Sequence, residues 1–449
     1  MGTMSEEYIL YGTAASGSKA DGLLAICKLN TSTPIRTFKQ NGSYCNRIAV
    51  LDSRILSSQS DRPVIHSYSI RKEAPMQKLI LQEKLSCIAA SHSSKYLAAG
   101  THSGKFILWE LDSGACLIYK EIHYGSINCL VFSQDDSVLF SAGSDARIYS
   151  WRTLDLCNAH SNYNDLQPLA TANQHSLEVT GLYCGYGGIL DSRLYSISLD
   201  GSCRVWNASD LRLQTTFVFK ESLLSIVVDP AERAIYAGCD NGVIYQVDLY
   251  RQPREGAGLL EYTGGLQRIV DVSSESTMKF AQHTDKILSL DLSFDGTLLV
   301  SGSQDGTVIV WDVSTHQVMK NIKPGRGPVY VVRVLENLHS EHYTRQESLG
   351  FSYNTTYTFN NDVWIAVPES DESNVRYSIS ETALIGSEPM AHVDSGEGIP
   401  TMIQGASGSE DMQAKVEKLS TAYNALWQAY TAAVGMSENG DYEDLANPK

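Results

Sequence analysis

The sequence predicts an all-β protein: a seven-bladed β-propeller followed by an acidic extension and a C-terminal coiled-coil helix. Three observations predict it. A pattern of His, Ser, Asp and Trp recurs along the first 335 residues, short apolar runs are separated by turn signals, and acidic charge is concentrated in the last 114 residues. A repeat of about 40 residues that supplies one small sheet is typical of β-propellers.

The clearest copy of the repeat is "HTDKILSLDLSFDGTLLVSGSQDGTVIVWD", residues 283–312. A first apolar run leads through a turn to a second strand at Leu298–Ser303. A tight turn at Asp305 and Gly306 then leads to a third strand that ends at Trp311. An Asp-Gly pair between two apolar runs is a strong hairpin signal.

Two further stretches keep the polar spacing of this copy. In residues 123–151, as in residues 283–312, His precedes Ser by 18 residues, Ser precedes Asp by 4 and Asp precedes Trp by 6. The two sets are His283, Ser301, Asp305 and Trp311, and His123, Ser141, Asp145 and Trp151. A third set, Ser196, Asp200 and Trp206, keeps the spacings of 4 and 6, whereas His175 lies three residues further upstream than expected.

Weaker copies extend the frame to seven blades. Their third strands end at residues 27, 68, 109, 151, 206, 247 and 311, so the intervals are 41, 41, 42, 55, 41 and 64. Each of the two long intervals holds a candidate surface insertion, at 158–173 and 251–276. The propeller is expected over residues 1–335, with residues 327–335 supplying the missing inner strand of blade one, because ring closure removes exposed sheet edges.

The repeated His, Ser and Asp groups also raise the question of a catalytic triad. A nucleophile with its base is needed once and beside a cleft, but here the same set recurs from blade to blade. We therefore interpret these residues as structural tetrads, buried hydrogen-bond chains in which each polar group finds a partner. No nucleophile elbow, zinc-protease motif or phosphate-binding loop occurs in the sequence. No catalytic, cofactor-binding or metal residue is predicted, and the protein is expected not to be an enzyme.

Composition and charge narrow the functional classes. The nine cysteines stand singly between Cys27 and Cys239, which favours buried thiols in a reducing compartment. The N-terminus lacks a secretory signal, and no apolar run is long enough to span a membrane. Residues 1–335 hold 33 acidic and 30 basic side chains, whereas residues 336–449 hold 18 and 5. Without a large basic excess, direct nucleic-acid binding is disfavoured and protein partners are expected.

The C-terminal quarter has three predicted parts. Residues 336–408 form an acidic, partly disordered extension, with the alternative that its aromatic residues lie on the propeller or on a partner. Residues 409–436 form a coiled-coil helix, and residues 437–449 an acidic tail. The helix carries a seam of apolar residues at alternating spacings of 4 and 3, namely Met412, Val416, Leu419, Tyr423, Leu426 and Tyr430. Pairing with its twin or with a partner helix is expected, and folding back on the propeller is the alternative.

The repeats resemble WD40 repeats throughout the propeller. The segment "TFKQ" at residues 37–40, the flanking Asn46, the strand pair from Gln59 to Tyr68 and the acidic extension resemble one family more closely. This family is the WD-repeat subunit of the complex that processes the internal transcribed spacer of pre-rRNA on late pre-60S particles. The resemblance implies a nuclear scaffold, found in the nucleolus and nucleoplasm, that has no activity of its own. It further implies two copies joined through the C-terminal helix, a helical-repeat scaffold partner, and remodelling of the pre-60S particle by the ATPase midasin.

Some blades lack the tryptophan of the repeat, and the sequence also allows a second functional class. Val247 and Cys27 stand where the repeat has Trp. The alternative function is a substrate receptor or adaptor of another assembly, such as a cullin ubiquitin ligase, although the blade ends "WDVS" and "WRTL" lack the arginine typical of that class. No adjacent arginines occur, so a phosphoinositide-binding loop is not supported and membrane binding is not expected.

Overall fold

The structure is a computed structural model of the chain. It describes residues 7–14, 22–39, 48–51, 54–59, 62–158, 166–251, 261–263, 267–272, 278–324, 327–336, 355–360 and 363–368. The chain divides into two compact units, 1–374 and 375–449, and all described residues belong to the first. The helix expected at 409–436, with its seam residues, and the tail at 437–449 lie outside the described residues. No described helix has the length and apolar character needed to cross a membrane.

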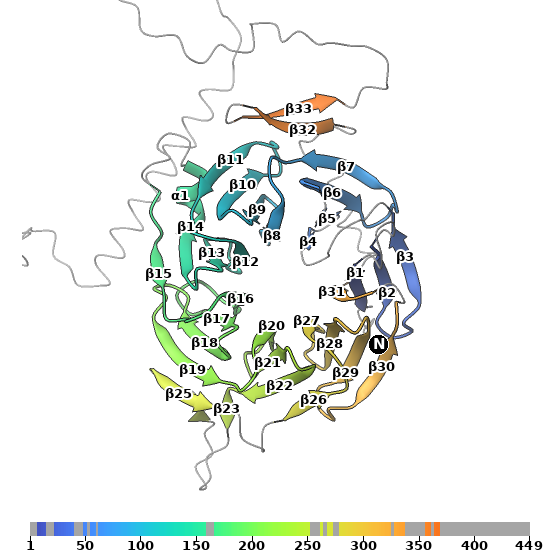
Figure 1. The fold of residues 1–449 in the computed structure, drawn as a ribbon, viewed down its shortest axis with the longest axis vertical. Coiled ribbons are helices and arrows are strands. Elements are labelled where there is room, and N and C mark those ends of the chain that lie inside the picture. The colour runs from blue at the N-terminus through green and yellow to red at the C-terminus, as the bar shows by residue number, and fades with distance from the viewer. Residues whose placement is uncertain are drawn as a thin grey trace, which may run out of the picture. The chain divides into compact units, whose positions relative to one another are not determined.

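Seven antiparallel sheets stand side by side around a central channel (Figure 1), so the propeller predicted from the sequence is confirmed. From channel to rim, blade 1 contains β31 (Val329–Glu336), β1 (Glu7–Thr13), β2 (Leu24–Lys28) and β3 (Pro34–Phe38). Blade 2 contains β4 (Ile48–Val50), β5 (Arg54–Ser58), β6 (Val64–Ser69) and β7 (Pro75–Ile80). Blade 3 contains β8 (Leu85–Ala90), β9 (Tyr96–Thr101), β10 (Lys105–Glu110) and β11 (Cys116–Glu121).

The remaining four blades follow the same order. Blade 4 contains β12 (Ile127–Phe132), β13 (Val138–Gly143), β14 (Ile148–Arg152) and β15 (Ala170–Ala172). Blade 5 contains β16 (Val179–Cys184), β17 (Arg193–Ser198), β18 (Ser202–Asn207) and β19 (Leu213–Val218). Blade 6 contains β20 (Leu223–Val228), β21 (Ala234–Cys239), β22 (Val243–Asp248) and β26 (Lys279–Ala281), and blade 7 contains β27 (Ile287–Leu292), β28 (Leu298–Ser303), β29 (Val308–Asp312) and β30 (Val318–Ile322).

The ring closes within blade 1, where the first and last strands of the propeller meet. β31 pairs antiparallel with β1 from Glu7 opposite Glu336 to Thr13 opposite Val329. The closing strand therefore lies where the sequence places it, although it begins at Val329. Val329 and Val332 are completely buried against blade 7. Closure consequently joins residues more than 300 positions apart and leaves β1 without a free edge.

Apolar clusters between neighbouring blades form the core, and polar side chains tie the inner strands together. Around the channel, several side chains on one inner strand donate to a backbone carbonyl on the next. Examples are Asn128 to Val179 (3.0 Å), Thr180 to Leu223 (2.7 Å) and Ser225 to Ile287 (3.1 Å). The Ser289 hydroxyl reaches Val332 of the closing strand in the same way. These bonds satisfy inner polar groups and fix the spacing of neighbouring blades.

Two insertions alter the regular ring. The first begins earlier than the sequence suggests, with the short helix α1 (Thr153–Asn158), which packs Leu156 into the core between blades 3 and 4. The second contains β23 (Tyr250–Arg251), β24 (Glu261–Tyr262) and β25 (Arg268–Asp271). β25 returns to the preceding blade and pairs parallel with β19. This insertion is thus more than a surface loop, since it covers the outer edge of blade 5.

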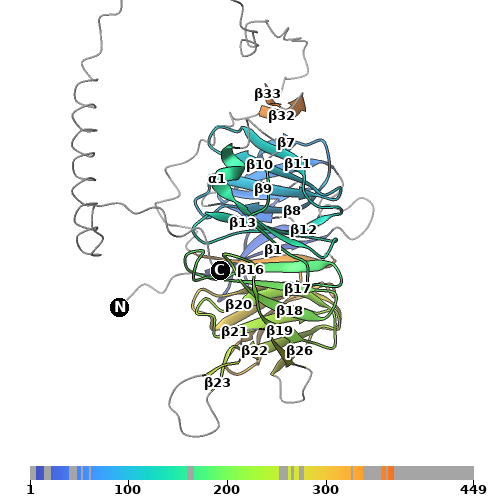
Figure 2. The ribbon, with the colours of Figure 1, turned by 90° about the vertical axis from the view of Figure 1, so that its left-hand side faces the viewer.

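A hairpin of the extension lies on the outer edge of blade 2, as Figures 1 and 2 show. Its strands are β32 (Thr355–Asn360) and β33 (Val363–Pro368), and the sheet order is β33-β32-β7. β32 runs parallel to β7, with Thr356 opposite Lys78. This arrangement agrees with the alternative in which part of the extension contacts the propeller.

Candidate functional site

The structure brings the predicted tetrad residues together in blades 4, 5 and 7. In blade 4, His123 Nδ1 lies 3.0 Å from Asp145 Oδ2, and Nε2 lies 2.9 Å from Ser141 Oγ. The Trp151 indole N–H donates to the same Oγ over 3.0 Å. An indole nitrogen can only donate, so the serine hydroxyl accepts from Trp151 and is left to donate its proton to His123. Each of these four side chains therefore has a hydrogen-bond partner within the tetrad.

Blade 7 repeats this geometry. His283 lies 3.0 Å from Asp305 and 2.7 Å from Ser301, and Trp311 donates to Ser301 over 2.8 Å. Ser301 is completely buried, and its hydroxyl contacts His283, Trp311 and the Ile309 carbonyl. A nucleophile must reach its substrate, so this serine is not placed for nucleophilic chemistry.

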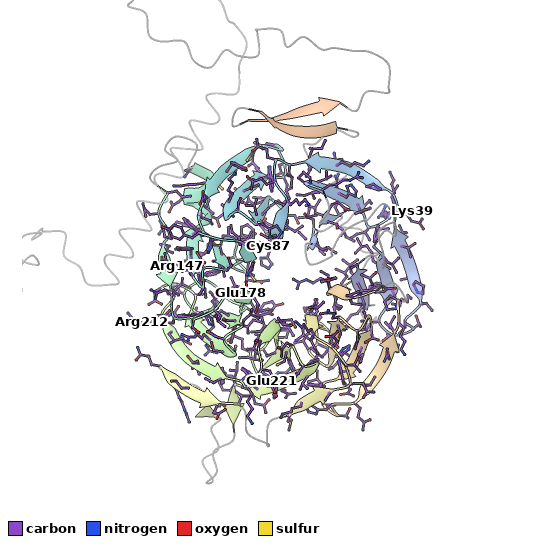
Figure 3. All side chains as sticks on the ribbon, viewed as in Figure 1. Lys39, Cys87, Arg147, Glu178, Arg212 and Glu221 are labelled. Atoms are coloured by element: carbon purple, nitrogen blue, oxygen red, sulfur yellow. The ribbon has the colours of Figure 1, made fainter. Side chains whose placement is uncertain are left out.

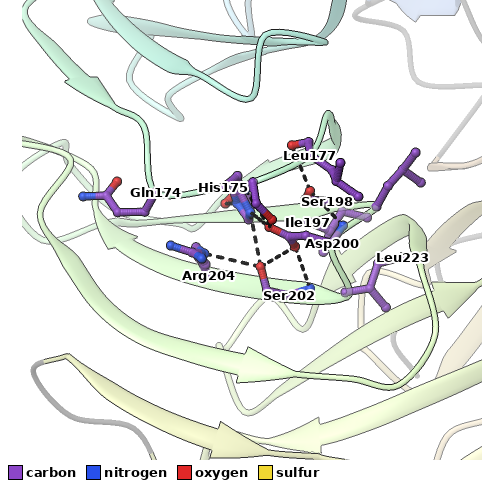
Figure 4. Close-up of polar contacts among 12 residues, drawn as sticks. Gln174, His175, Leu177, Ile197, Ser198, Asp200, Ser202, Arg204 and Leu223 are labelled. Carbon is purple, nitrogen blue, oxygen red and sulfur yellow. Dashed lines mark hydrogen bonds and ion pairs between the residues drawn. The ribbon is translucent and has the colours of Figure 1, made fainter.

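Blade 5 contains a complete tetrad in spite of its irregular spacing. His175 lies 3.1 Å from Asp200, and Figure 4 shows these two residues beside Ser202. His175 also lies 2.7 Å from Ser196, and the Trp206 indole N–H donates to Ser196 over 2.8 Å. The three additional residues lie in the turn between β16 and β17, which extends over residues 185–192. The distance from the histidine to the start of the first strand is unchanged. The displaced histidine thus reflects a longer turn on the opposite side of the blade and not a lost tetrad.

Burial and hydrogen bonds set the charge states of the tetrads. Burial opposes ionisation of Asp145, but its interaction with His123 and the hydrogen bonds from the backbone N–H groups of Arg147 and Tyr124 together hold the aspartate pKa below its usual range. The pKa values of Asp200 and Asp305 are lowered against the same opposition from burial. Burial also lowers the pKa of His175 below 6.5, and the neighbouring aspartate offsets this only in part. In blades 5 and 7, neutral histidine beside ionised aspartate is consequently the state that the fold favours.

We expect the propeller to lose stability as the pH falls below about 6.5. The pKa values of His175 and His283 are lowered in the folded protein, so their contribution is complete above the unfolded pKa of 6.5 and declines below it. The aspartate contribution is lost further down, below the unfolded pKa of 3.8. Thermal unfolding between pH 7.5 and 5 measures the first decline. The double variant His175→Gln/His283→Gln should flatten this decline. An unchanged slope in the double variant would refute the assignment.

Replacing Asp305 with asparagine should destabilise the protein by about 1–3 kcal/mol. The Asp305 carboxylate accepts from His283, from the backbone N–H of Thr284 (3.2 Å) and from Thr307 (2.8 Å to N, 2.6 Å to Oγ1). An amide keeps one acceptor but turns the other into a donor. Asp145→Asn should behave likewise. The exposed surface variant Asp112→Asn is the control, and chemical denaturation of the three variants should rank the two tetrad variants as clearly less stable.

Blades 2 and 3 are stabilised by other polar side chains, which the repeat pattern does not predict. In blade 2, Tyr68 replaces the tryptophan, and its hydroxyl donates to the Lys39 carbonyl over 2.9 Å. His66 Nδ1 lies 3.3 Å from both that hydroxyl and Gln59 Nε2. All four of these residues belong to the segments that carry the family resemblance. Their role in the structure is therefore to replace the tetrad with another buried network.

Blade 3 uses an ion pair for the same purpose. Glu83 accepts from Ser103 and Lys105, and the Tyr119 hydroxyl lies 3.5 Å from it. Burial opposes the Glu83 charge, but the hydrogen bonds from Lys105 and Ser103 lower its pKa. Ser103 stands at the aspartate position of the repeat, six residues before Trp109. Ser103 is visible in the sequence as a departure from the repeat. Glu83, the acid that contacts it, lies outside the repeat motif and is not indicated by it.

Several large side chains on the surface of the propeller are exposed and can contact a protein partner. On the face formed by the turns that lead into the inner strands, Tyr124 is 85% exposed and Leu177 53% exposed. The Arg147 guanidinium lies 5.6 Å from the Tyr124 ring centroid. On the opposite face, Leu190 and Phe294 are 77% and 66% exposed. Exposed Tyr and Arg are typical of residues that anchor protein partners, and Figure 3 places Arg147 on blade 4.

Among the described residues, no group of three acidic, His or Cys side chains could hold a metal ion.

Comparison with known proteins shows which family carries this fold. A family model for the WD domain, G-beta repeat, matches residues 114–152 and 274–312. These segments end with the third strands of blades 4 and 7, the two blades with regular tetrads. Pre-rRNA-processing protein IPI3 from Yarrowia lipolytica is 32% identical over 341 residues, which are 74% of this chain and 76% of the relative. The chain belongs to the IPI3 family of WD-repeat proteins.

The similarity to this family extends over almost the whole chain. Pre-rRNA-processing protein crb3/ipi3 from Schizosaccharomyces pombe is 27% identical over 454 residues, covering 94% of this chain and 99% of the relative. WD repeat-containing protein 18 from Homo sapiens is 28% identical over 312 residues, 69% of each chain. The family resemblance noted in the sequence is thus confirmed. The match to the fission yeast protein also extends beyond the propeller residues.

Proposed function

We propose that this IPI3-family chain is a non-enzymatic scaffold of a nuclear complex that matures pre-60S ribosomal subunits and processes the pre-rRNA spacer. The observation that carries the proposal is the match over 99% of a fission yeast protein named for pre-rRNA processing. The buried tetrads support a scaffold, because their hydroxyl and imidazole groups are occupied within the blades. Function then depends on the outer surfaces of the propeller.

The partners follow from the same proposal. A helical-repeat scaffold subunit would bind the propeller, and the complex would join the pre-60S particle on which midasin acts. The exposed Tyr124 ring, with the Arg147 guanidinium beside it, offers one compact contact, and the exposed Leu177 lies on the same face of the propeller. An aromatic ring with a neighbouring guanidinium supplies large contact area at small conformational cost. Sequence-specific nucleic-acid binding and membrane binding form no part of the proposal.

Purification of the tagged full chain from its own cells tests the proposed function. Ribosome-assembly factors and precursors that contain the internal transcribed spacer should co-purify, and depletion of the chain should make those precursors accumulate. Tyr124→Ala combined with Arg147→Ala should weaken this association while the protein stays folded. The matched control changes Phe294 on the opposite face to alanine. Recovery of ubiquitin-ligase subunits without assembly factors would contradict the proposal.

Self-association through the C-terminal helix is a further part of the proposed function. We expect deletion of residues 409–436 to halve the molar mass in light scattering, because the seam from Met412 to Tyr430 would otherwise pair two copies. The propeller should remain folded, as shown by an unchanged circular dichroism spectrum of its β-sheets. Replacing Leu419 and Leu426 with aspartate should have the same effect as the deletion. An unchanged mass in both variants would exclude the dimer.

A further inference from the structure

Basic side chains gather on the rim between blades 1 and 2. Residues 22–95 hold 11 basic and 4 acidic side chains, although the propeller as a whole is almost neutral. Five of the basic residues lie on β3, directly after β3, on β7 and in the turn before β7, and we call them the basic rim: Arg36, Lys39, Arg71, Lys72 and Lys78. Arg71 and Lys72 are exposed, and the Lys39 side chain is 71% exposed. Figure 3 shows Lys39 where blade 1 meets blade 2.

Strand register shows that these residues belong to one surface. On β3, Arg36 shares a face with Phe38, which packs in the core between blades 1 and 2. On β7, Lys78 stands opposite His66, on the face of blade 2 that carries Tyr68 in the same core. Arg36 and Lys78 therefore approach the junction of the two blades from opposite sides.

The turn between β6 and β7 meets the end of β3. The Lys39 N–H donates to the Glu73 carbonyl over 2.9 Å, and the two side chains form an ion pair at 3.0 Å. Glu73 thus balances one of the five positive charges, which leaves an excess of four. Like charges this close together raise the local potential and favour a ligand with several negative groups.

The hairpin of the extension brings an acidic segment to this surface. β32 pairs with β7, and β33 is the next strand outward. Pro368, the last residue of β33, stands opposite Thr355, beside the Thr356–Lys78 position. Strands in a sheet lie about 4.8 Å apart, so the end of β33 is roughly 10 Å from β7. β33 runs antiparallel to β7 and hence toward the turn that carries Arg71 and Lys72.

The sequence that follows β33 has the complementary charge. Residues 369–372 read "ESDE", with three carboxylates in four positions. Residues 369–408 together hold seven acidic side chains and one basic side chain. Four extended residues span about 13 Å, so carboxylates that start at Pro368 can reach the turn.

We propose that the acidic run 369–372 of the chain's own extension docks on the basic rim of blades 1 and 2. Individual exposed ion pairs are weak, but a short covalent link supplies an effective concentration in the millimolar range and lets several weak pairs act together. The docked run covers the positive surface and keeps other polyanions from it.

Carbodiimide cross-linking of the full chain tests the proposal, because this reagent joins lysine to carboxylate without a spacer. We expect Lys72 or Lys78 to be joined to the peptide that contains residues 369–372. The Lys39–Glu73 ion pair is the internal positive control, and exposed Lys286 on blade 7 is the matched negative control. Cross-links should fall about tenfold from 0.1 M to 1 M salt, where the Debye length shrinks from about 10 Å to about 3 Å.

Charge reversal separates the proposal from its alternatives. The variant Glu369→Lys/Asp371→Lys/Glu372→Lys should lose the cross-link, and adding Arg71→Glu/Lys72→Glu should restore it with reversed polarity. Mixing isotope-labelled and unlabelled protein distinguishes contacts within one copy from contacts between copies. Links spread evenly over exposed lysines, or links only between copies, would overturn the proposal. So would binding of a single-stranded polyuridylate probe that needs Arg71 and Lys72 but is unaffected by Glu369→Gln/Asp371→Asn/Glu372→Gln, since the rim would then be an open nucleic-acid surface.

Discussion

Replacing Trp206 with alanine is expected to destabilise the propeller by about 3–5 kcal/mol. Trp206 is completely buried and belongs to the core between blades 4 and 5. The change removes the largest side chain of that core and also the indole donor that Ser196 accepts at 2.8 Å. A cavity and an incompletely satisfied hydroxyl would therefore arise together.

Two further variants separate these effects. Trp206→Phe keeps most of the ring but not the N–H group, so the expected cost is about 1–2 kcal/mol. Tyr124→Ala removes a similarly large ring that is 85% exposed, and should change stability by less than about 0.5 kcal/mol. Urea unfolding followed by circular dichroism measures all three. A cost for Trp206→Ala near that of Tyr124→Ala would show that the tetrads do not brace the ring.

Removing the closing strand is expected to prevent stable folding of the propeller. A chain that ends at Gly327 lacks β31 and leaves the hydrogen-bonding edge of β1 open. It also uncovers the apolar cluster at the junction with blade 7, which includes Ile9 and Val308. Open edges and exposed apolar surface favour association between copies. Gel filtration and light scattering should show aggregates without a cooperative thermal transition.

The control for this truncation ends nine residues later, at Glu336. It keeps all of β31 and should give a soluble monomer with a single thermal transition. The point variant Val332→Asp in the full chain places a charge where the structure has a completely buried side chain, and should approach the behaviour of the truncation. If the chain ending at Gly327 unfolds at the same temperature as the control, ring closure does not hold the propeller together.

Much of the fold could be predicted because the repeat is local. The seven predicted strand ends, from Cys27 to Trp311, all fall in the third strands of the blades. The tetrads could be predicted in the same way, since His, Ser, Asp and Trp stand within about 30 residues and their spacing follows the strand and turn lengths. The exception, His175, shows the limit of this reasoning, because an additional turn changes the spacing without changing the contact.

The features that sequence reasoning missed do not recur from blade to blade. The Tyr68–Lys39 bond and the ion pair between Glu83 and Lys105 have no fixed spacing that repeats from blade to blade. The pairing of β25 with β19 joins an insertion of blade 6 to the edge of blade 5. Nothing in the local pattern indicates which open edge a strand will cover.

The sequence by itself determined the number of blades, the strands of each blade and the polar residues that brace three of them. These depend on alternation, turn residues and spacings of at most a few tens of residues, which act within one sheet. Only the tertiary structure decided how the blades without a tetrad are braced, which outer edges are covered, and that basic residues from β3 and β7 meet on one rim. These depend on which blade surfaces the closed ring places side by side, and such neighbours are set by packing between blades and not by order along the chain.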